Sequence, residues 1–316
     1  MNIQRGIHDA HTLYRNQVMK MYKKLMLVIN PNAGRGGYKT GLGEALKTLD
    51  KGGFRTTLYF TSYPGEATEL VKHFAPDYDV VACIGGDGTL SEVISGLVTL
   101  PSPPPLGYFP MGTTNDVART LNLPVNDNVS AAMRILNGKP HDFDVGLFGD
   151  DKYFAYIAAF GVFTDVPYVT PQDQKKWLGH LAYVLQGAQQ LNKIEPVHTL
   201  VEYDGGVIEA DLLYGSMSNS TSVAGILKLP EQLVLLGDGM SELVLVKYPD
   251  KITALTQMLE SVINQRFDNE NLLVLHTKKA KFTFNAPVSW TRDGEDGGAY
   301  TSVELSNLPR AVQLIF

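Results

Sequence analysis

A short apolar run that stops at a glycine turn and continues into a helical pattern constrains the fold of this chain most. The run covers residues 80–84, and a Gly-Gly-Asp-Gly turn follows at 85–88. After the turn, apolar residues recur at the spacing of one helix face: Leu90, Val93, Ile94, Leu97 and Val98. The pattern predicts a buried strand, a tight turn and a helix. Such a turn presents backbone N–H groups at the start of a helix, an arrangement that binds anions.

Asp87 gives this turn a second property. A carboxylate repels a bare phosphate, so it makes chemical sense in an anion site only beside a divalent cation or a ribose hydroxyl. The alternative interpretation is a tight turn in which Asp87 only caps the helix. We expect a ligand site, because comparable turns occur at two other places in the N-terminal half of the chain.

Short β-rich runs alternate with helical patterns up to residue 140. The runs cover residues 25–29, 56–60, 80–84 and 106–109. This alternation predicts an α/β domain, in which a parallel sheet carries helices on both faces. Ligands of such sheets bind beyond the carboxyl ends of the strands. Since the glycine-rich turns follow these runs, we expect the turns to lie at one edge of the sheet.

From residue 141 onwards, strand-like runs dominate. They cover residues 141–148, 153–160, 197–203, 207–214, 243–246, 272–276, 281–285, 301–305 and 311–316. Helical patterns occur only at 174–191 and 253–264. This part predicts a second, β-rich domain built as a sandwich or a barrel-like sheet. We therefore expect a polar N-terminal extension at 1–23, an α/β domain at 24–140 and a β-rich domain at 141–309.

The composition excludes several classes of function. The formal net charge is −6 and no dense basic face is present, which argues against nucleic-acid binding. Cys83 is the only cysteine, which excludes an internal disulfide and fits a reducing compartment. No apolar stretch of about 18 residues predicts a transmembrane helix. The first 20 residues lack the apolar core of a signal peptide, so we expect a cytoplasmic protein.

Three turns carry the chemistry. They are the Asn-Pro turn (residues 30–34), the Gly-Asp-Gly turn (residues 85–89) and the Gly-Thr turn (residues 112–116). Together they offer backbone N–H groups, hydroxyls, an amide and the carboxylates of Asp87 and Asp116. Mg²⁺ typically takes one or two carboxylates together with phosphate oxygens. The set predicts a site for a nucleotide polyphosphate with its metal ion.

Other nucleotide and metal patterns do not fit. Tyr38 precedes Lys39-Thr40, and Ala33 stands where a P-loop would begin with glycine. No G-x-G-x-x-G opens a helix after the first strand, which leaves a dinucleotide site unsupported. The protein-kinase signatures are missing, and the histidines and lone cysteine form no zinc pattern.

The three turns, in this order and spacing, resemble the catalytic family of diacylglycerol kinases. Further similarity lies at 61–67, 238–239 and 293–295, so the resemblance covers residues 24–316. The Gly-Gly-Asp-Gly element alone is shared with NAD kinases and phosphofructokinases. The resemblance implies an N-terminal nucleotide-binding domain of that α/β type and a C-terminal β-sandwich domain. It also implies that a last strand at about 310–316 returns to the first domain.

The resemblance implies roles for individual residues. The nucleotide ATP would contact the following set: Asn30, Pro31, Asn32, Ala33, Gly34, Thr61, Gly85, Gly86, Asp87, Gly88, Thr89, Leu90, Ser91 and Thr113. Asp87 and Asp116 would lie near the catalytic Mg²⁺. Glu295 matches the position of the general base, which accepts the proton of a lipid hydroxyl as the phosphoryl group is transferred. A second, structural Mg²⁺ would be held by the side chain of Asp238 and by the backbone carbonyls of Leu235 and Met240.

Several of these positions have a purely structural alternative. Glu295 and Asp238 fit solvated turn residues, and Asp116 fits a helix cap. Lys175-Lys176-Trp177 suits a membrane-surface anchor, but it equally suits one exposed turn of a helix. The run at 153–163 suits an acyl-chain cleft or, more simply, a core strand.

We therefore expect a lipid kinase that uses ATP and Mg²⁺ to phosphorylate a hydroxyl of diacylglycerol or a related lipid. Such an enzyme would be cytoplasmic, would contact the inner membrane surface peripherally, and is compatible with a homodimer. One alternative is an NAD kinase-like enzyme that phosphorylates a soluble nucleotide. The other is a catalytically inactive regulator that binds nucleotide or lipid.

Overall fold

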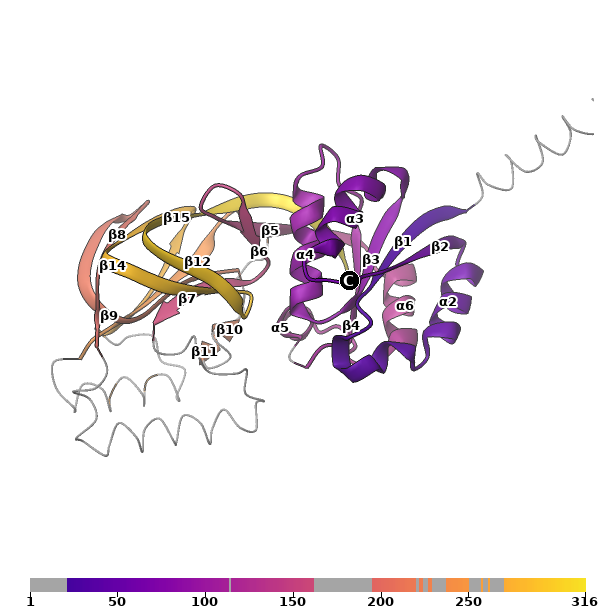
Figure 1. Cartoon of the computed structure of the whole chain (residues 1–316), viewed down its shortest axis with the longest axis horizontal. Coiled ribbons are helices and arrows are strands. Elements are labelled where there is room, and N and C mark those ends of the chain that lie inside the picture. The colour runs from indigo at the N-terminus through magenta and orange to yellow at the C-terminus, as the bar shows by residue number, and fades with distance from the viewer. Residues whose placement is uncertain are drawn as a thin grey trace, which may run out of the picture. The chain divides into compact units, whose positions relative to one another are not determined.

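The computed structural model describes residues 22–113, 115–161, 195–219, 222–223, 227–228, 237–249, 257, 261 and 270–316 (Figure 1). The chain divides into two compact units. Unit 1 contains Met1–Thr113, Leu123–Pro140 and Gln313–Phe316, and unit 2 contains Thr114–Asn122 and His141–Val312.

Unit 1 is built on a parallel sheet, as the alternation of runs predicts. Its strands are β1 (Lys23–Ile29), β2 (Phe54–Phe60), β3 (Val80–Gly85) and β4 (Leu106–Pro110), in the order β2-β1-β3-β4. Ile29 pairs in register with Phe60 on one side and with Ile84 on the other. The last part of the chain joins the free edge of β4, where Leu314 pairs in parallel with Leu106. The carboxyl ends of β1, β2 and β3 therefore lie at the same level.

The helices of unit 1 cover both faces of this sheet (Figure 1). They are the 3-10 helix η1 (Ala33–Lys39), α2 (Leu42–Lys51), α3 (Glu66–Phe74), the 3-10 helix η2 (Ala75–Asp77), α4 (Asp87–Val98) and α6 (Asn128–Asn137). Helices α2 and α6 pack on the face that carries Leu25, Leu27 and Ile29. Figure 1 shows α3 and α4 on the opposite side. Strands β3 and β4 are buried along their whole length and β1 is buried from Leu25 onwards, which explains their continuous apolar runs. In the edge strand β2, only Phe54 is buried.

Unit 2 is dominated by antiparallel strands and also contains the short helix α5 (Asp116–Thr120). Its strands are β5 (Pro140–Phe148), β6 (Lys152–Phe154), β7 (Ile157–Gly161), β8 (Val197–Tyr203), β9 (Gly206–Ser218), β10 (Ser222–Val223), β11 (Leu227–Lys228), β12 (Ser241–Lys247), β13 (Leu272–Thr277), β14 (Lys279–Arg292) and β15 (Glu295–Ile315). The order along the main sheet is β13-β12-β9-β7-β14-β15. The mixed α/β character agrees with the expected fold class, and the sandwich arrangement of unit 2 stays a prediction.

Aromatic side chains fill the core of unit 2. Trp290 is 1% exposed, and its ring lies 4.8 Å from Phe160, 5.1 Å from Phe282 and 5.4 Å from Phe148, measured between centroids.

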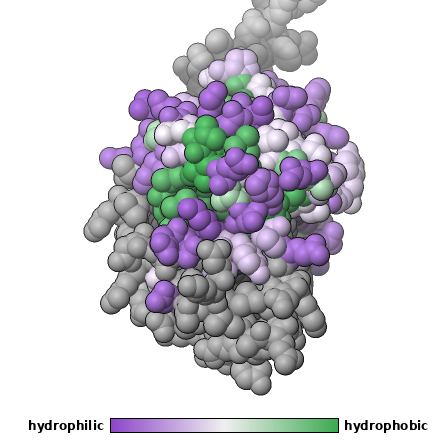
Figure 2. All heavy atoms as spheres, turned by 90° about the vertical axis from the view of Figure 1, so that its left-hand side faces the viewer, coloured by the Kyte–Doolittle hydropathy of each residue, from purple (hydrophilic) through white to green (hydrophobic). Residues whose placement is uncertain are grey.

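Figure 2 shows a face over unit 2 on which hydrophobic residues gather in an area bordered by hydrophilic ones. The most exposed large hydrophobic side chain of the described residues is Val207, at 65%.

Three sequence predictions about the C-terminal part need correction. Separate short strands were expected at 281–285, 301–305 and 311–316, but these runs are parts of the two long strands β14 and β15. The residues between the runs alternate between buried and exposed or lie exposed, so they carry little hydrophobic signal.

Some expected features lie outside the described residues. They are the helix at 174–191, Lys175-Lys176-Trp177, Leu235 and most of the helix at 253–264. No helix among the described residues is long and apolar enough to cross a membrane.

Candidate active site

The turns that follow β1, β3 and β4 are joined by backbone hydrogen bonds. The N–H of Asn30 donates to the carbonyl of Ile84 at 3.0 Å, and the N–H of Met111 donates to the carbonyl of Gly85 at 2.7 Å. These bonds continue the parallel ladders one residue past the strand ends. The Asn-Pro turn, the Gly-Asp-Gly turn and the start of the Gly-Thr turn therefore lie side by side, as the sequence predicts.

The side chain of Asn30 links the first two turns. Its Nδ2 donates to Oγ1 of Thr89 at 3.0 Å, and its Oδ1 accepts from the N–H of Asn32 at 2.9 Å. Both polar atoms of the amide are thus engaged, one across 59 residues of sequence and one within the Asn-Pro turn. In this structure, the Asn30 side chain holds the Asn-Pro turn against the Gly-Asp-Gly turn and so fixes the shape of the site.

Glycines allow the three turns to approach closely. A Cβ at Gly34, whose φ is +55°, would lie 2.1 Å from the carbonyl oxygen of Met111. A Cβ at Gly86 would lie 3.1 Å from Cα of Gly112. A Cβ at Gly85 would lie 2.4 Å from Oγ1 of Thr89. At Gly34 and Gly86, backbone therefore packs directly against backbone, which a side chain at either position would prevent.

Helix α4 starts at the centre of these turns. Its N-cap is Gly86 and its first residue is Asp87. The alternative interpretation, in which Asp87 only caps the helix, is therefore wrong. The N–H of Leu90 donates to the carbonyl of Gly86 at 3.1 Å, and the Leu90 side chain is fully buried. The N–H groups of Gly88 and Thr89 come before this first intrahelical bond and belong to the positions that bind anions at helix starts. Asp87 is half-buried, and its carboxylate stands beside them in sequence.

The Glu92 side chain, which sequence reasoning missed, joins α3 to α4 by hydrogen bonds. Oε1 of Glu92 accepts from the N–H of Gly65 at 2.8 Å, and Oε2 accepts from the N–H of Ala67 at 3.2 Å. The Glu92 carbonyl also accepts from Oγ1 of Thr68 at 2.8 Å. Glu92 therefore caps a helix other than its own, since the N-cap of α3, Gly65, has no side chain to do so. The loop held in this way begins at Thr61, whose N–H donates to the carbonyl of Ile29 at 2.9 Å.

The second carboxylate expected at the metal, Asp116, belongs to unit 2. It is 8% exposed and is the first residue of α5, while the N-cap is Asn115, in the left-handed region at φ +52°. Asp116 is therefore not the cap of its helix. Thr113, which is exposed, is the last residue of this stretch that belongs to unit 1.

In the Asp-Gly-Glu motif at 293–295, the aspartate has a structural role. Asp293 is 5% exposed, and its carboxylate accepts three backbone N–H groups, those of Ala155, Tyr156 and Ile157, at 2.6–3.1 Å. Asp293 and Gly294 form a two-residue hairpin with φ of +50° and +83°, typical of a type I′ turn. This hairpin fixes the position of Glu295, which is exposed as the first residue of β15.

The Asp-Gly turn at 238–239 is held by a buried carboxylate that sequence reasoning also missed. Asp144 is fully buried, and its Oδ2 accepts from the N–H of Gly239 at 2.7 Å and from Nδ2 of Asn307 at 2.8 Å. Its Oδ1 accepts from the N–H of Arg310 at 2.7 Å. An aspartate inside the apolar run of β5 was the available signal. Asp238 itself is exposed, and its Oδ1 accepts from the N–H of Met240 at 2.9 Å.

Cys83 behaves as the sequence predicts. It is fully buried in β3, and desolvation raises the pKa of its thiol above the ordinary value. Its side chain fills the sheet and is not a nucleophile. In the part of the chain that the structure describes, no cluster of three or more histidine, cysteine, aspartate or glutamate side chains has the geometry of a metal site.

Comparison with known proteins now assigns the family. Residues 24–148 match the family model of the diacylglycerol kinase catalytic domain. A diacylglycerol kinase of Bacillus subtilis (strain 168) is 31% identical over 294 residues, which cover 93% of this chain and 96% of that protein. The chain belongs to the diacylglycerol kinase family. A diacylglycerol kinase of Staphylococcus aureus (strain MRSA252) is 37% identical over 228 residues, or 72% of this chain and 71% of the relative.

The fold agrees with this family. A crystal structure of a diacylglycerol kinase from Bacillus anthracis str. Sterne aligns with a TM-score of 0.70 at 23% identity, over 93% of this chain and 97% of that one. The segment that matches the diacylglycerol kinase domain contains all three turns and Asp116. Asp238 and Glu295 lie beyond this segment. Similarity to the Bacillus subtilis protein covers 93% of the chain.

Proposed function

We propose that this member of the diacylglycerol kinase family is a lipid kinase that uses ATP and Mg²⁺ to phosphorylate a hydroxyl of diacylglycerol or a related lipid. The observation that carries the proposal is the edge of unit 1 where the Asn-Pro turn, the Gly-Asp-Gly turn and the start of the Gly-Thr turn interlock. Asn30 and Thr89 are bonded there at 3.0 Å, and the Gly-Asp-Gly turn opens α4. The names of the relatives support the lipid acceptor.

The residues at this edge fit a phosphate chain with a cation. Backbone N–H groups at the start of α4 bind phosphate oxygens, and Asp87 supplies a carboxylate for the metal. We assign ATP contacts to the set predicted from sequence, from Asn30 to Thr113, with Leu90 limited to its backbone because its side chain is fully buried. Asp87 and Asp116 are the proposed partners of the catalytic Mg²⁺. Bound Mg²⁺ neutralises charge on the transferred phosphoryl group.

Glu295 is the proposed general base. Its carboxylate would accept the proton of the lipid hydroxyl while that oxygen attacks the γ-phosphorus of ATP and ADP leaves. The Asp293 bonds described above hold the hairpin that presents it. A rigid hairpin suits this role, because general-base catalysis requires the carboxylate within hydrogen-bond reach of the hydroxyl.

We assign the nucleotide to an N-terminal domain of residues 24–140, which the final strand at about 310–316 joins, and the lipid to residues 141–309. Asp238, with the carbonyls of Leu235 and Met240, remains our proposed site for a structural Mg²⁺. Its exposed carboxylate suits a cation, and Asp144 fixes the turn that carries it. Since diacylglycerol resides in membranes, we propose peripheral contact with the membrane surface, for which the hydrophobic area in Figure 2 is a candidate.

An acceptor panel tests the proposed function. The full chain is incubated with γ-labelled ATP, Mg²⁺ and mixed micelles that contain diacylglycerol, monoacylglycerol, ceramide or sphingosine, and in a parallel reaction with NAD. We expect label in the organic extract with diacylglycerol or a near relative among these lipids. Label in the aqueous phase that depends on NAD would instead support an NAD kinase-like enzyme. Tight ATP binding without transfer to any acceptor would indicate an inactive regulator.

A further inference from the structure

Phe60 stands out at the nucleotide edge of unit 1. It is the last residue of β2, precedes Thr61 directly, and leaves 47% of its surface exposed. A single exposed apolar side chain needs no explanation on its own. The position of this ring within the sheet and the way it is supported set it apart.

The strand register places Phe60 at a nucleotide's length from the Gly-Asp-Gly turn. Phe60 pairs with Ile29, and Ile29 pairs with Ile84, the residue before Gly85. Two strand spacings separate Phe60 from Ile84, which amounts to about 10 Å. A ribose and one or two phosphates span a gap of this order. A base whose phosphates occupied the start of α4 could therefore reach Phe60, and β1 lies between them (Figure 1).

A supporting ring and a buried amide hold this position. The Tyr38 ring meets Phe60 edge-on, with 6.1 Å between centroids and 69° between planes. Tyr38 packs against the core cluster of unit 1. The backbone around it is fixed by Asn128, 2% exposed, whose Nδ2 donates to the carbonyls of Tyr38 and Thr40 at 2.8 Å each. Phe60 therefore rests on an ordered support, so stacking a ligand on it costs little conformational entropy.

The charge at this place suits the same ligand. Nζ of Lys39 lies 5.8 Å from the centroid of the Tyr38 ring. Lys39 is an exposed residue, so its charge suits an anionic ligand. An aromatic surface with a nearby cation matches a nucleotide, which combines a flat base with negative phosphates.

We propose that Phe60, backed by Tyr38, is the stacking platform for the purine base of the nucleotide donor. This inference rests on the proposed function in one respect, which is that the donor is ATP. Base–aromatic stacking in nucleic-acid complexes weakens roughly 5- to 150-fold when the ring is removed. We expect the same loss of affinity here for a nucleotide, which carries a base, and no loss for a phosphate chain without a base.

Calorimetric binding to the full chain with Mg²⁺ tests the platform. Phe60→Ala is expected to weaken ADP binding at least about fivefold and to leave tripolyphosphate binding unchanged. Phe60→Tyr should restore ADP binding. Leu58→Ala is the matched control, since Leu58 is an exposed apolar residue on the same strand and face, at 37%. In steady-state assays, Phe60→Ala should raise KM for ATP and leave kcat unchanged.

A fluorescent reporter gives a readout that does not depend on activity. The indole of Phe60→Trp should be quenched by ADP but not by tripolyphosphate, and that of Leu58→Trp by neither. Unchanged ADP affinity in Phe60→Ala, or equal losses for ADP and tripolyphosphate, would overturn the platform. If no lipid accepts phosphate but ADP binding still depends on Phe60, the proposed function fails and the platform stands.

Discussion

At the scale of single residues, the candidate site depends on groups that shape it as much as on groups that would react. Asn30 lies in the set expected to touch ATP, yet both ends of its amide are bonded within the protein. Thr89 accepts one of these bonds and is 6% exposed. The sequence motif identifies such residues, but it does not distinguish a residue that contacts a ligand from one that supports the turn.

Gly34 and Gly36 allow a sharp test of this close packing. Both have positive φ, so alanine at either position is strained by about 1 kcal/mol. Only at Gly34 would the new Cβ also clash, because Met111 O lies 2.1 Å away, whereas nothing lies within 4 Å at Gly36. We expect Gly34→Ala to weaken ADP binding at least about tenfold and Gly36→Ala to bind normally, measured by calorimetry. Equal effects of the two substitutions would contradict the interlocked turns.

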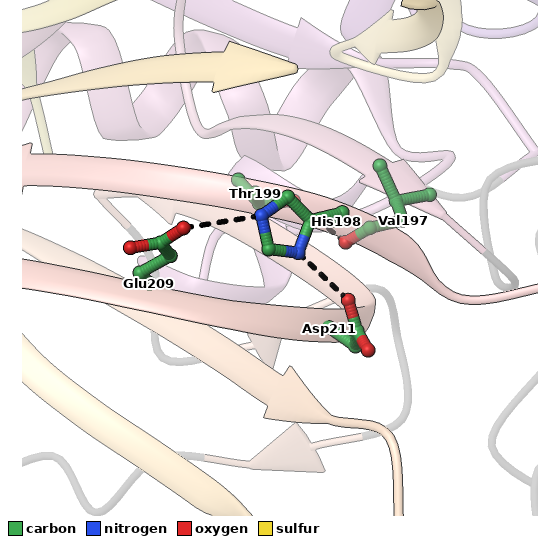
Figure 3. Close-up of polar contacts among 5 residues, drawn as sticks. All are labelled: Val197, His198, Thr199, Glu209 and Asp211. Carbon is green, nitrogen blue, oxygen red and sulfur yellow. Dashed lines mark hydrogen bonds and ion pairs between the residues drawn. The ribbon is translucent and has the colours of Figure 1, made fainter. Parts of the chain in front are cut away.

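His198 predicts a pH-dependent contribution to stability. Nδ1 of its ring lies 2.9 Å from Asp211, and Nε2 lies 3.2 Å from Glu209 (Figure 3). The hydrogen bond with Asp211, and then that with Glu209, raises the pKa of His198 above its ordinary value of 6.5. A raised pKa in the folded state stabilises the protein in full below the unfolded pKa. The gain disappears as the pH rises through the folded pKa.

We therefore expect His198→Gln to lower Tm at a pH of about 5.5 and to leave it unchanged near pH 9. Asp211→Asn should reduce the pH dependence, because it removes the stronger partner. Thermal denaturation at several pH values measures both effects. The effect should be small, since all three side chains are exposed. A Tm difference of the same size at both pH values would contradict the assignment.

At the scale of elements, Glu92 couples α4 to the loop that ends in α3. We expect Glu92→Gln to lower the free energy of unfolding by about 1–2 kcal/mol, because the amide's NH₂ group cannot accept from one of the two N–H donors. KM for ATP should rise with little change in kcat, since the loop starts at Thr61. Urea denaturation and steady-state kinetics measure the two effects. Glu44→Gln, an exposed residue of α2, is the control.

If Glu92→Gln leaves both stability and KM unchanged, the cap has no role in the site. Loss of stability with an unchanged KM would leave Glu92 a helix cap and contradict its coupling to nucleotide binding. Restoration of KM by Glu92→Asp would support the carboxylate as the positioning group.

The elements also show where sequence reasoning succeeds and fails. The strand, turn and helix at 80–98 could be predicted, because run length and helical period are local signals. Two contacts link segments that are distant in sequence: the hydrogen bond from Asn30 to Thr89 and the one that Glu92 accepts from Gly65. The Glu92 contact leaves no local pattern in the sequence. In β14 and β15, exposed residues between apolar runs hid the true length of the strands.

At the scale of the whole molecule, the chain passes from unit 1 to unit 2 and returns. Strand β15 starts at Glu295 in unit 2, and its last residues belong to unit 1, where Leu314 pairs with Leu106. Similarity to the Bacillus subtilis relative covers 93% of the chain, so both units belong to what the family shares. A β-rich second region could be predicted from sequence, but Asp144, which ties together β5, β15 and the turn at 238–239, could not.

The central claim is lipid phosphorylation with the nucleotide at the Gly-Asp-Gly turn and Glu295 as base. The most direct test is transfer of label from γ-labelled ATP to diacylglycerol by wild type, Asp87→Asn, Glu295→Gln and the neighbouring control Asp296→Asn. We predict phosphatidate from wild type and from Asp296→Asn. Glu295→Gln should lose roughly 10²–10⁴-fold in kcat and keep its ADP affinity, and Asp87→Asn should also lose turnover. Full turnover in both Asp87→Asn and Glu295→Gln, or no labelled lipid from wild type, would contradict the account.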